Sequence, residues 1–152
     1  MGNTDSVQRG QARDLLIKQI TSHRDDLANR YQQVLRDNLF SNRADLRPSM
    51  IKQIASDETE AILNFLNQPE FSNMDRGVQL HKAGLGERTV LRLGQTTRQF
   101  LLANLEQDHI PFILEIVDEY EEGVVQGFIK GLEEYHLGEI ERTRNALQRG
   151  VN

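Results

Sequence analysis

Cysteine and tryptophan are absent from this chain of 152 residues. Without cysteine, the chain has no disulfide framework, no thiolate nucleophile and no cysteine-based metal site. The longest apolar runs cover only three or four residues, whereas a helix needs about 20 apolar residues to cross a bilayer. The first residues, Met1–Ser6, also lack the charged and apolar segments of a secretory signal. These absences predict a cytoplasmic protein without a membrane span.

Clustered basic charge is missing too. The 18 Lys and Arg residues are outnumbered by 23 Asp and Glu residues, the net charge is -5, and no basic run exceeds two residues. Nucleic acid is therefore not expected as a partner, because binding it needs a clustered basic face. Catalytic triads and phosphate-binding loops are also absent, since Gly84 and Gly86 join two expected helices and follow no strand. The sequence thus predicts a protein that is not an enzyme.

The chain has only three prolines, and each lies where a helical pattern begins. Proline costs no hydrogen bond in the first turn of a helix. Apolar residues recur at helical spacing through the chain, and no segment shows the clean alternation of a strand. We therefore predict a single all-α domain of about six helices over residues 1–152. The expected helices are 6–20, 22–40, 47–66, 69–83, 87–105 and 111 to about 150. Pro48, Pro69 and Pro111 lie at the starts of the third, fourth and sixth of these helices.

Local signals refine this plan at three places. Ser22 and Asp25 match an S-x-x-D capping box, which predicts a break or a kink between the first two helices. Gly84 is expected to end the fourth helix, because glycine adopts the left-handed conformation there without steric cost. The apolar side of the first helix is expected to hold Val7, Leu15, Leu16 and Ile20.

The last helix is the most informative element. At about 1.5 Å per residue it would be roughly 60 Å long, longer than a compact domain of this size is wide. Three glycines, Gly123, Gly127 and Gly131, lie four residues apart on one of its faces. Each costs about 0.5–1 kcal/mol of helix stability relative to alanine, so a closely approaching helix is expected there. That helix belongs either to a second copy or to the same chain.

The end of this helix carries a different pattern. His136, Ile140, Thr143 and Leu147 follow each other in steps of four and three, which is a short heptad seam flanked by charges of both signs. The seam predicts the start of a parallel coiled coil in a homodimer, continuing beyond Val151. Because the apolar stripe changes phase between residues 131 and 138, a bend or a change of partner is expected in that segment.

Two residues are candidates for a cofactor site. His81 lies near the end of a helix, as the proximal ligand of a globin haem does, and Tyr31 could serve as a distal hydrogen-bond donor. Against haem, the segment between Tyr31 and His81 is short for a globin pocket, and aromatic residues make up only 6% of the chain, so we expect no cofactor. The haem-based alternative would make the protein a gas sensor.

Two stretches resemble the N-terminal domains of stressosome sensor proteins, the RsbR-type regulators. The first is Asp75–Leu91, in which a helix ends in a Gly-Leu-Gly element and an amphipathic helix follows. The second runs from Tyr120 to Gln148 and is similar to the helix that leads from those domains to their output domain. A departure from the family pattern is Gly86, where relatives commonly have a capping serine.

The resemblance implies a globin-like helical bundle without haem, with a long C-terminal helix. It also implies a dimeric, non-enzymatic signalling domain placed before an output domain such as a STAS domain or a histidine kinase. The expected organisation is an N-terminal helix at residues 6–20, a core at 22–135 and a linker or coiled-coil end at 136–152. A freestanding protein-binding adaptor is the other alternative. A small apolar ligand stays open as a further partner, as does the nature of the signal.

Overall fold

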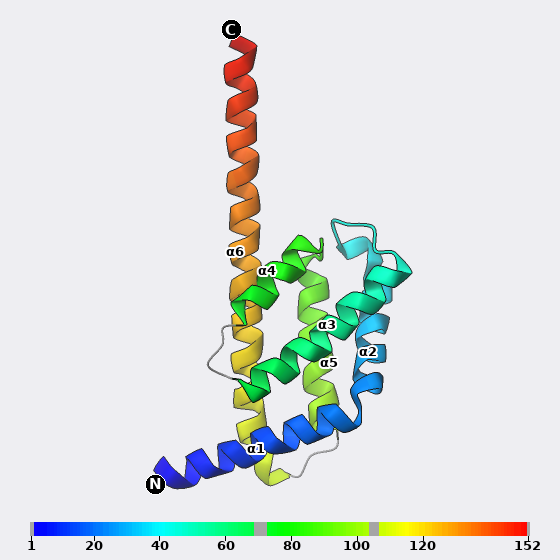
Figure 1. The fold of residues 1–152 in the computed structure, drawn as a ribbon, viewed down its shortest axis with the longest axis vertical. Coiled ribbons are helices and arrows are strands. Elements are labelled where there is room, and N and C mark those ends of the chain that lie inside the picture. The colour runs from blue at the N-terminus through cyan, green and yellow to red at the C-terminus, as the bar shows by residue number, and fades with distance from the viewer. Residues whose placement is uncertain (1, 69–72, 104–106, 152) are drawn as a thin grey trace.

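The computed structural model describes residues 2–68, 73–103 and 107–151 (Figure 1). Within these ranges the chain forms six α-helices and two short 3₁₀ helices, and it contains no strand. The predicted all-α bundle with a long C-terminal helix is therefore confirmed. The α-helices are α1 (Gly2–Ser22), α2 (Arg24–Asp37), α3 (Pro48–Asn67), α4 (Met74–Lys82), α5 (Glu87–Leu102) and α6 (Ile110–Val151), and the 3₁₀ helices are η1 (Leu39–Ser41) and η2 (Gln107–His109).

Helix α1 crosses one end of the bundle, near the start of α6 (Figure 1). It packs through Ala12, Leu16 and Ile20, all fully buried. The prediction for its apolar side was half wrong, because Val7 is 59% exposed and Leu15 is 36% exposed. Ala12 takes their place, since it lies four residues before Leu16 on the same face.

The break between the first two helices is confirmed, but the capping box is not formed. One residue, His23, separates α1 from α2 and occupies the N-cap of α2 without a side-chain cap hydrogen bond. Helix α3 begins at Pro48 as expected. The expected start of the fourth helix at Pro69 and its apolar residue Phe71 lie outside the described residues, and the described α4 begins at Met74.

The end of α4 follows the prediction for Gly84. This glycine has φ of 89°, the only positive φ among the described residues. Its N–H donates to the carbonyl of His81 at 2.9 Å, and the N–H of Leu85 donates to the carbonyl of Leu80 at 3.3 Å. These two bonds form a Schellman motif, which satisfies the last carbonyls of the helix. The motif turns the chain directly into α5.

Helix α6 is half embedded and half free. Its first half contributes the apolar stripe predicted from the sequence, and every member of the stripe is buried. The C-terminal part of the helix extends past all other elements (Figure 1). No helix in the described part of the chain combines the length and apolar content of a membrane span. The buried stripe consists of Ile113, Ile116, Val117, Tyr120, Val124 and Phe128.

Candidate functional site

The three glycines of α6 face α4 of the same chain. A Cβ atom added at Gly127 would overlap with the backbone carbonyl of Met74, and one at Gly123 would lie 2.6 Å from Cγ of Asn73. At Gly131 an added Cβ would lie 3.0 Å from Cβ of His81. Of the two partners expected for this face, the structure provides the intramolecular one, and α4 covers the surface that a second copy would need.

Gly77 of α4 completes this contact from the other side. An added Cβ there would overlap with the carbonyl of Val124 and would lie 2.5 Å from the backbone nitrogen of Phe128. Small residues on both helices therefore let the two backbones approach closely. The sequence carries this signal, because Gly77 lies inside a nine-residue helix, where glycine is costly. Spacing along α6 alone does not reveal it, because Gly77 lies on another helix.

The predicted heptad seam lies on the free end of α6. All residues from Glu139 to Gly150 are exposed, and Ile140 and Leu147 are 57% and 68% exposed. His136 and Thr143 are exposed as well. The structure therefore places these four seam residues on one accessible helix, apart from the glycine face. Their role in a dimer stays a prediction.

His81 is enclosed by side chains rather than by an open pocket. It is 4% exposed, and its ring makes edge contacts with Phe128 at 5.3 Å and Tyr135 at 5.9 Å between centroids. Burial lowers the pKa of His81, and the charges of Arg43 and His136 lower it further. The neutral imidazole is therefore favoured, and its Nε2 atom is buried without a hydrogen-bond partner.

Tyr31 faces different neighbours from His81. Its side chain is fully buried, and its hydroxyl shares a hydrogen bond of 2.5 Å with Oγ1 of Thr97. Burial raises the pKa of Tyr31, and the Glu58 carboxylate raises it further. Of the two haem candidates, Tyr31 thus has its hydroxyl paired within the protein, whereas Nε2 of His81 has no hydrogen-bond partner. Among the described residues, no group of three or more His, Asp or Glu side chains could hold a metal ion.

A buried ionic network links α3, α4 and α6, and the sequence analysis missed it. Nε of Arg76 donates to Oε2 of Glu58 at 2.8 Å, and the side chains are only 9% and 4% exposed. The hydroxyl of Tyr120 donates to Oε1 of Glu58 at 2.8 Å, and Nη2 of Arg76 donates to the Ile54 carbonyl at 3.3 Å. Burial and the nearby carboxylate raise the pKa of Tyr120 well above its usual value, so its phenol stays protonated and can donate.

The signal for this network was present in the sequence. Glu58 lies four residues after Ile54 and four before Ile62, within the buried stripe of α3. A charged residue inside an apolar stripe needs a partner when it is buried. Pairing it with Arg76 would have required the three-dimensional arrangement, because the two residues lie on different helices.

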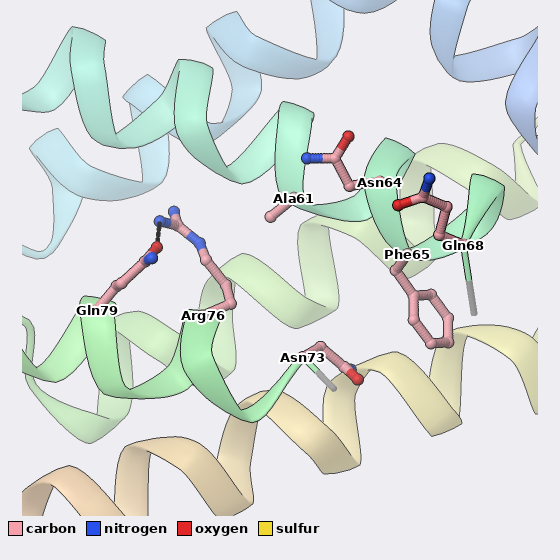
Figure 2. A pocket seen from close by; sticks show the side chains of 7 residues that line it. All are labelled: Ala61, Asn64, Phe65, Gln68, Asn73, Arg76 and Gln79. Atoms are coloured by element: carbon pink, nitrogen blue, oxygen red, sulfur yellow. Dashed lines mark hydrogen bonds between the residues drawn. The ribbon is translucent and has the colours of Figure 1, made fainter. Parts of the chain in front are cut away.

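A pocket of about 420 Å³ opens between α3 and α4, beside this network (Figure 2). Four of its side chains are amides, and the buried Arg76 also contributes to its wall. Nη1 of Arg76 donates to Oε1 of Gln79 at 3.4 Å (Figure 2). The lining is therefore mixed, and the small apolar ligand left open by the sequence stays a prediction. The lining residues are Ala61, Asn64, Phe65, Gln68, Asn73, Arg76 and Gln79.

Two residues of the pocket wall reach the same residue of α6. Nδ2 of Asn73 donates to the backbone carbonyl of Tyr120 at 2.6 Å. Arg76 reaches the hydroxyl of Tyr120 through Glu58. The pocket is thus connected to α6 by short hydrogen bonds at both the backbone and the side chain of Tyr120. This arrangement can transmit a displacement of α4 to α6, and it presents no nucleophile paired with a base.

Comparisons of the chain with protein-family models, with curated proteins and with solved structures found no match.

Proposed function

We propose that this chain is a non-catalytic cytoplasmic signalling domain that forms a homodimer and passes a signal through α6 to an output domain. The output domain would follow α6 and would be of the STAS or histidine kinase type, as the resemblance to RsbR-type stressosome sensors implies. In this proposal the globular part receives the signal and the free end of α6 carries it.

The free end of α6 is the observation that carries the proposal. From Glu133 to Gly150 no residue of α6 is buried, a length of about 27 Å at 1.5 Å per residue, and Tyr135 near the start of this stretch touches His81 and Arg43. A helix of this length without packing is marginal in water, because most helical stability in proteins comes from burying an apolar face. Ile140 and Leu147 lie in helical register on this end. A partner helix would cover both.

The embedded half of α6 gives a signal a direct route to this end. Tyr120 is tied to Asn73 and, through Glu58, to Arg76. Near the start of α6, Glu115 and Glu119 both pair with Arg9 of α1. A ligand or partner can act only through a difference in affinity for two arrangements of the protein. Any arrangement that moves α4 or α1 would therefore bias the position of α6.

The dimer is tested by sedimentation velocity over the micromolar range. Wild type is expected at the mass of two chains, and Ile140→Glu combined with Leu147→Glu is expected at the mass of one, with an unchanged thermal midpoint of the globular part. Phe40→Glu is the control, because Phe40 is fully exposed on η1 and lies far from α6 along the chain. A wild-type protein that stays monomeric across this range would refute the proposal.

A further inference from the structure

The exposed side of α6 carries an apolar stripe longer than the heptad seam alone. Val125, Ile129 and Leu132 precede His136 in steps of four, three and four, and the seam from His136 to Leu147 repeats these steps. The pattern is thus two successive eleven-residue units. An eleven-residue repeat has 3.67 residues per turn, close to the 3.6 of a straight helix. The stripe therefore stays on one side of α6 from Val125 to Leu147.

This outer stripe lies apart from the buried one. Val124 is buried against the chain's own core, whereas the next residue, Val125, is rotated by about 100° around the helix axis. Ile129 is 47% exposed, and α6 continues without interruption through Gly131 and Gly138. We therefore expect the phase change near Gly131 to be a change of partner rather than a bend. Within the described residues the inner stripe packs on the chain's own core, whereas Ile129 and the seam residues of the outer stripe are exposed.

The outer stripe borders an apolar groove between α5 and α6. The groove has a volume of about 240 Å³, and its α5 side includes Leu91, which is 59% exposed. Contiguous exposed apolar surface of this kind marks interaction sites in soluble proteins. Six apolar residues line the groove: Val90, Leu91, Val125, Phe128, Ile129 and Leu132.

We infer that the dimer interface extends from the free end of α6 onto this α5/α6 face, and that its occupant is α6 of a second copy, parallel and in register. The inference rests on the proposed homodimer and specifies where the two copies meet. It replaces the glycine face, which α4 covers, with Leu91, Val125, Ile129 and Leu132 as the interface of the globular part.

The charges beside the seam support a second copy in parallel orientation. In the heptad frame of His136 to Leu147, Glu139 takes position g and Arg144 takes the following position e. In a parallel in-register pair, position g of one helix meets position e five residues on in the other, so each Glu139 faces Arg144 of the second copy. Within the single chain, Glu139 forms an exposed ion pair with Arg142 at 2.7 Å. Such a pair is weak and readily exchanged.

The same geometry accounts for Leu137, which lies off the stripe and is 66% exposed. Leu132 and Leu137 are also five residues apart, the spacing that joins positions g and e across a parallel pair. Leu132 of one copy therefore packs against Leu137 of the other. An antiparallel pair would separate the two grooves to opposite ends of the dimer and would lose both sets of contacts.

The apolar content of the stripe also requires the groove. The free end alone offers Ile140 and Leu147 as its large seam residues, beside the polar His136 and Thr143. A stable interface needs about 800 Å² from each partner, and two aliphatic residues with short flanks do not supply it. The groove residues add the missing area next to the seam. A two-fold axis parallel to α6 places the groove of one copy against the groove of the other, and the seam of one copy against the seam of the other.

The first test compares Leu91→Glu with Val7→Glu, since both side chains are 59% exposed and only Leu91 lies in the groove. Sedimentation velocity is expected to show at least a tenfold higher dimer dissociation constant for Leu91→Glu and no change for Val7→Glu. A Leu91→Glu protein that dimerises like wild type, while the Ile140→Glu and Leu147→Glu variant dissociates, would overturn this inference and leave the proposed function intact. A monomeric wild type would overturn both.

The second test uses the absence of cysteine from the chain. Ile129→Cys is expected to form a disulfide between copies under mild oxidation, because parallel packing in register brings the two cysteines together across the two-fold axis. Glu134→Cys lies on a third side of α6 and is the matched control, expected to remain a free thiol. Equal cross-linking of the two variants, or none at Ile129→Cys in a dimeric sample, would overturn the inference.

Discussion

Among single residues, Glu58 has the least freedom to change. Its carboxylate is buried and accepts one hydrogen bond from Arg76 and one from Tyr120. A buried ion pair contributes little net stability compared with an apolar pair of the same shape, but removing one partner leaves an uncompensated buried charge. The network therefore acts mainly on geometry, since it holds α3, α4 and α6 in one relative position.

The hydroxyl of Tyr120 provides a mild test of this network. Tyr120→Phe leaves Oε1 of Glu58 without its donor, and the expected loss is about 1–3 kcal/mol of unfolding free energy. Chemical denaturation followed by circular dichroism measures this loss. Tyr135→Phe is the control, because Tyr135 is 41% exposed and surface substitutions usually change stability by less than about 0.5 kcal/mol. Equal losses in the two variants would show that the network does not stabilise the fold.

The buried imidazole of His81 predicts a pH dependence. The pKa of His81 in the fold is lowered from 6.5, so the unfolded chain binds more protons than the folded chain once the pH falls below about 6.5. The stability that this residue contributes is complete above that value and is lost as the pH falls through the folded pKa. The expected slope is at most about 1.36 kcal/mol per pH unit.

His81→Phe should remove this slope, because it keeps a ring against Phe128 and Tyr135 but cannot be protonated. The unfolding free energies of wild type and His81→Phe are measured at pH 5 to 8 and subtracted at each pH. The titration of carboxylates that both proteins share cancels in this difference. Wild type is expected to lose more stability than His81→Phe below pH 6.5. Parallel curves would contradict the prediction.

Among elements, the glycines of the helices divide into two kinds with different expected effects. Gly10 of α1 has no atom within 4 Å of an added Cβ, and Gly138 of α6 has only Nη2 of Arg142 at 3.9 Å. Gly10→Ala should raise the unfolding free energy by about 0.5–1 kcal/mol, whereas Gly138→Ala should leave the unfolding of the globular part unchanged, because Gly138 lies beyond the last buried residue of α6. Gly127→Ala should lower it by about 1–3 kcal/mol, because the new methyl group overlaps with the Met74 carbonyl.

Thermal and chemical denaturation at one fixed protein concentration would measure these three variants. The fixed concentration is needed because association raises apparent stability. Gly127→Ala is the decisive variant, since a stabilising effect would mean that α4 and α6 are not in close contact. Gly138→Ala shares the same helix and serves as its matched control.

The elements also show how far the sequence could predict the structure. Periodicity predicted the helices and the buried stripe of α6 because each depends on residues close together in the chain. Gly84 was predicted because its conformation is local. The partner of the glycine face was not predicted. Glycines indicate that another backbone approaches the helix closely, but they do not indicate which segment that backbone belongs to. The Glu58 network and the pocket beside it depend on three helices meeting, which spacing along one helix cannot indicate.

At the scale of the whole molecule, α6 contributes one face to the globular core and another face to the proposed dimer interface. Its inner stripe is part of the globular core, and its outer stripe faces away from that core. In the proposed function, a rigid helix with both stripes would transmit a rotation or a shift of the core to its free end without any hinge. Gly131 supports this view, because an added Cβ there would lie 3.0 Å from Cβ of His81, so this glycine makes room for α4.

The continuity of the outer stripe gives the last prediction. One alanine inserted between Gly138 and Glu139 rotates the free end by about 100° relative to the globular part, so the groove and the seam no longer face the same partner. Seven inserted residues of a helix-forming sequence add nearly two full turns and restore the alignment to within about 20°.

The one-residue insertion should raise the dimer dissociation constant at least tenfold, and the seven-residue insertion should recover most of that loss. Both proteins should unfold at the wild-type midpoint when compared as monomers, because the insertion lies beyond the last buried residue of α6. Equal affinity for both insertions would show that the seam and the groove act independently.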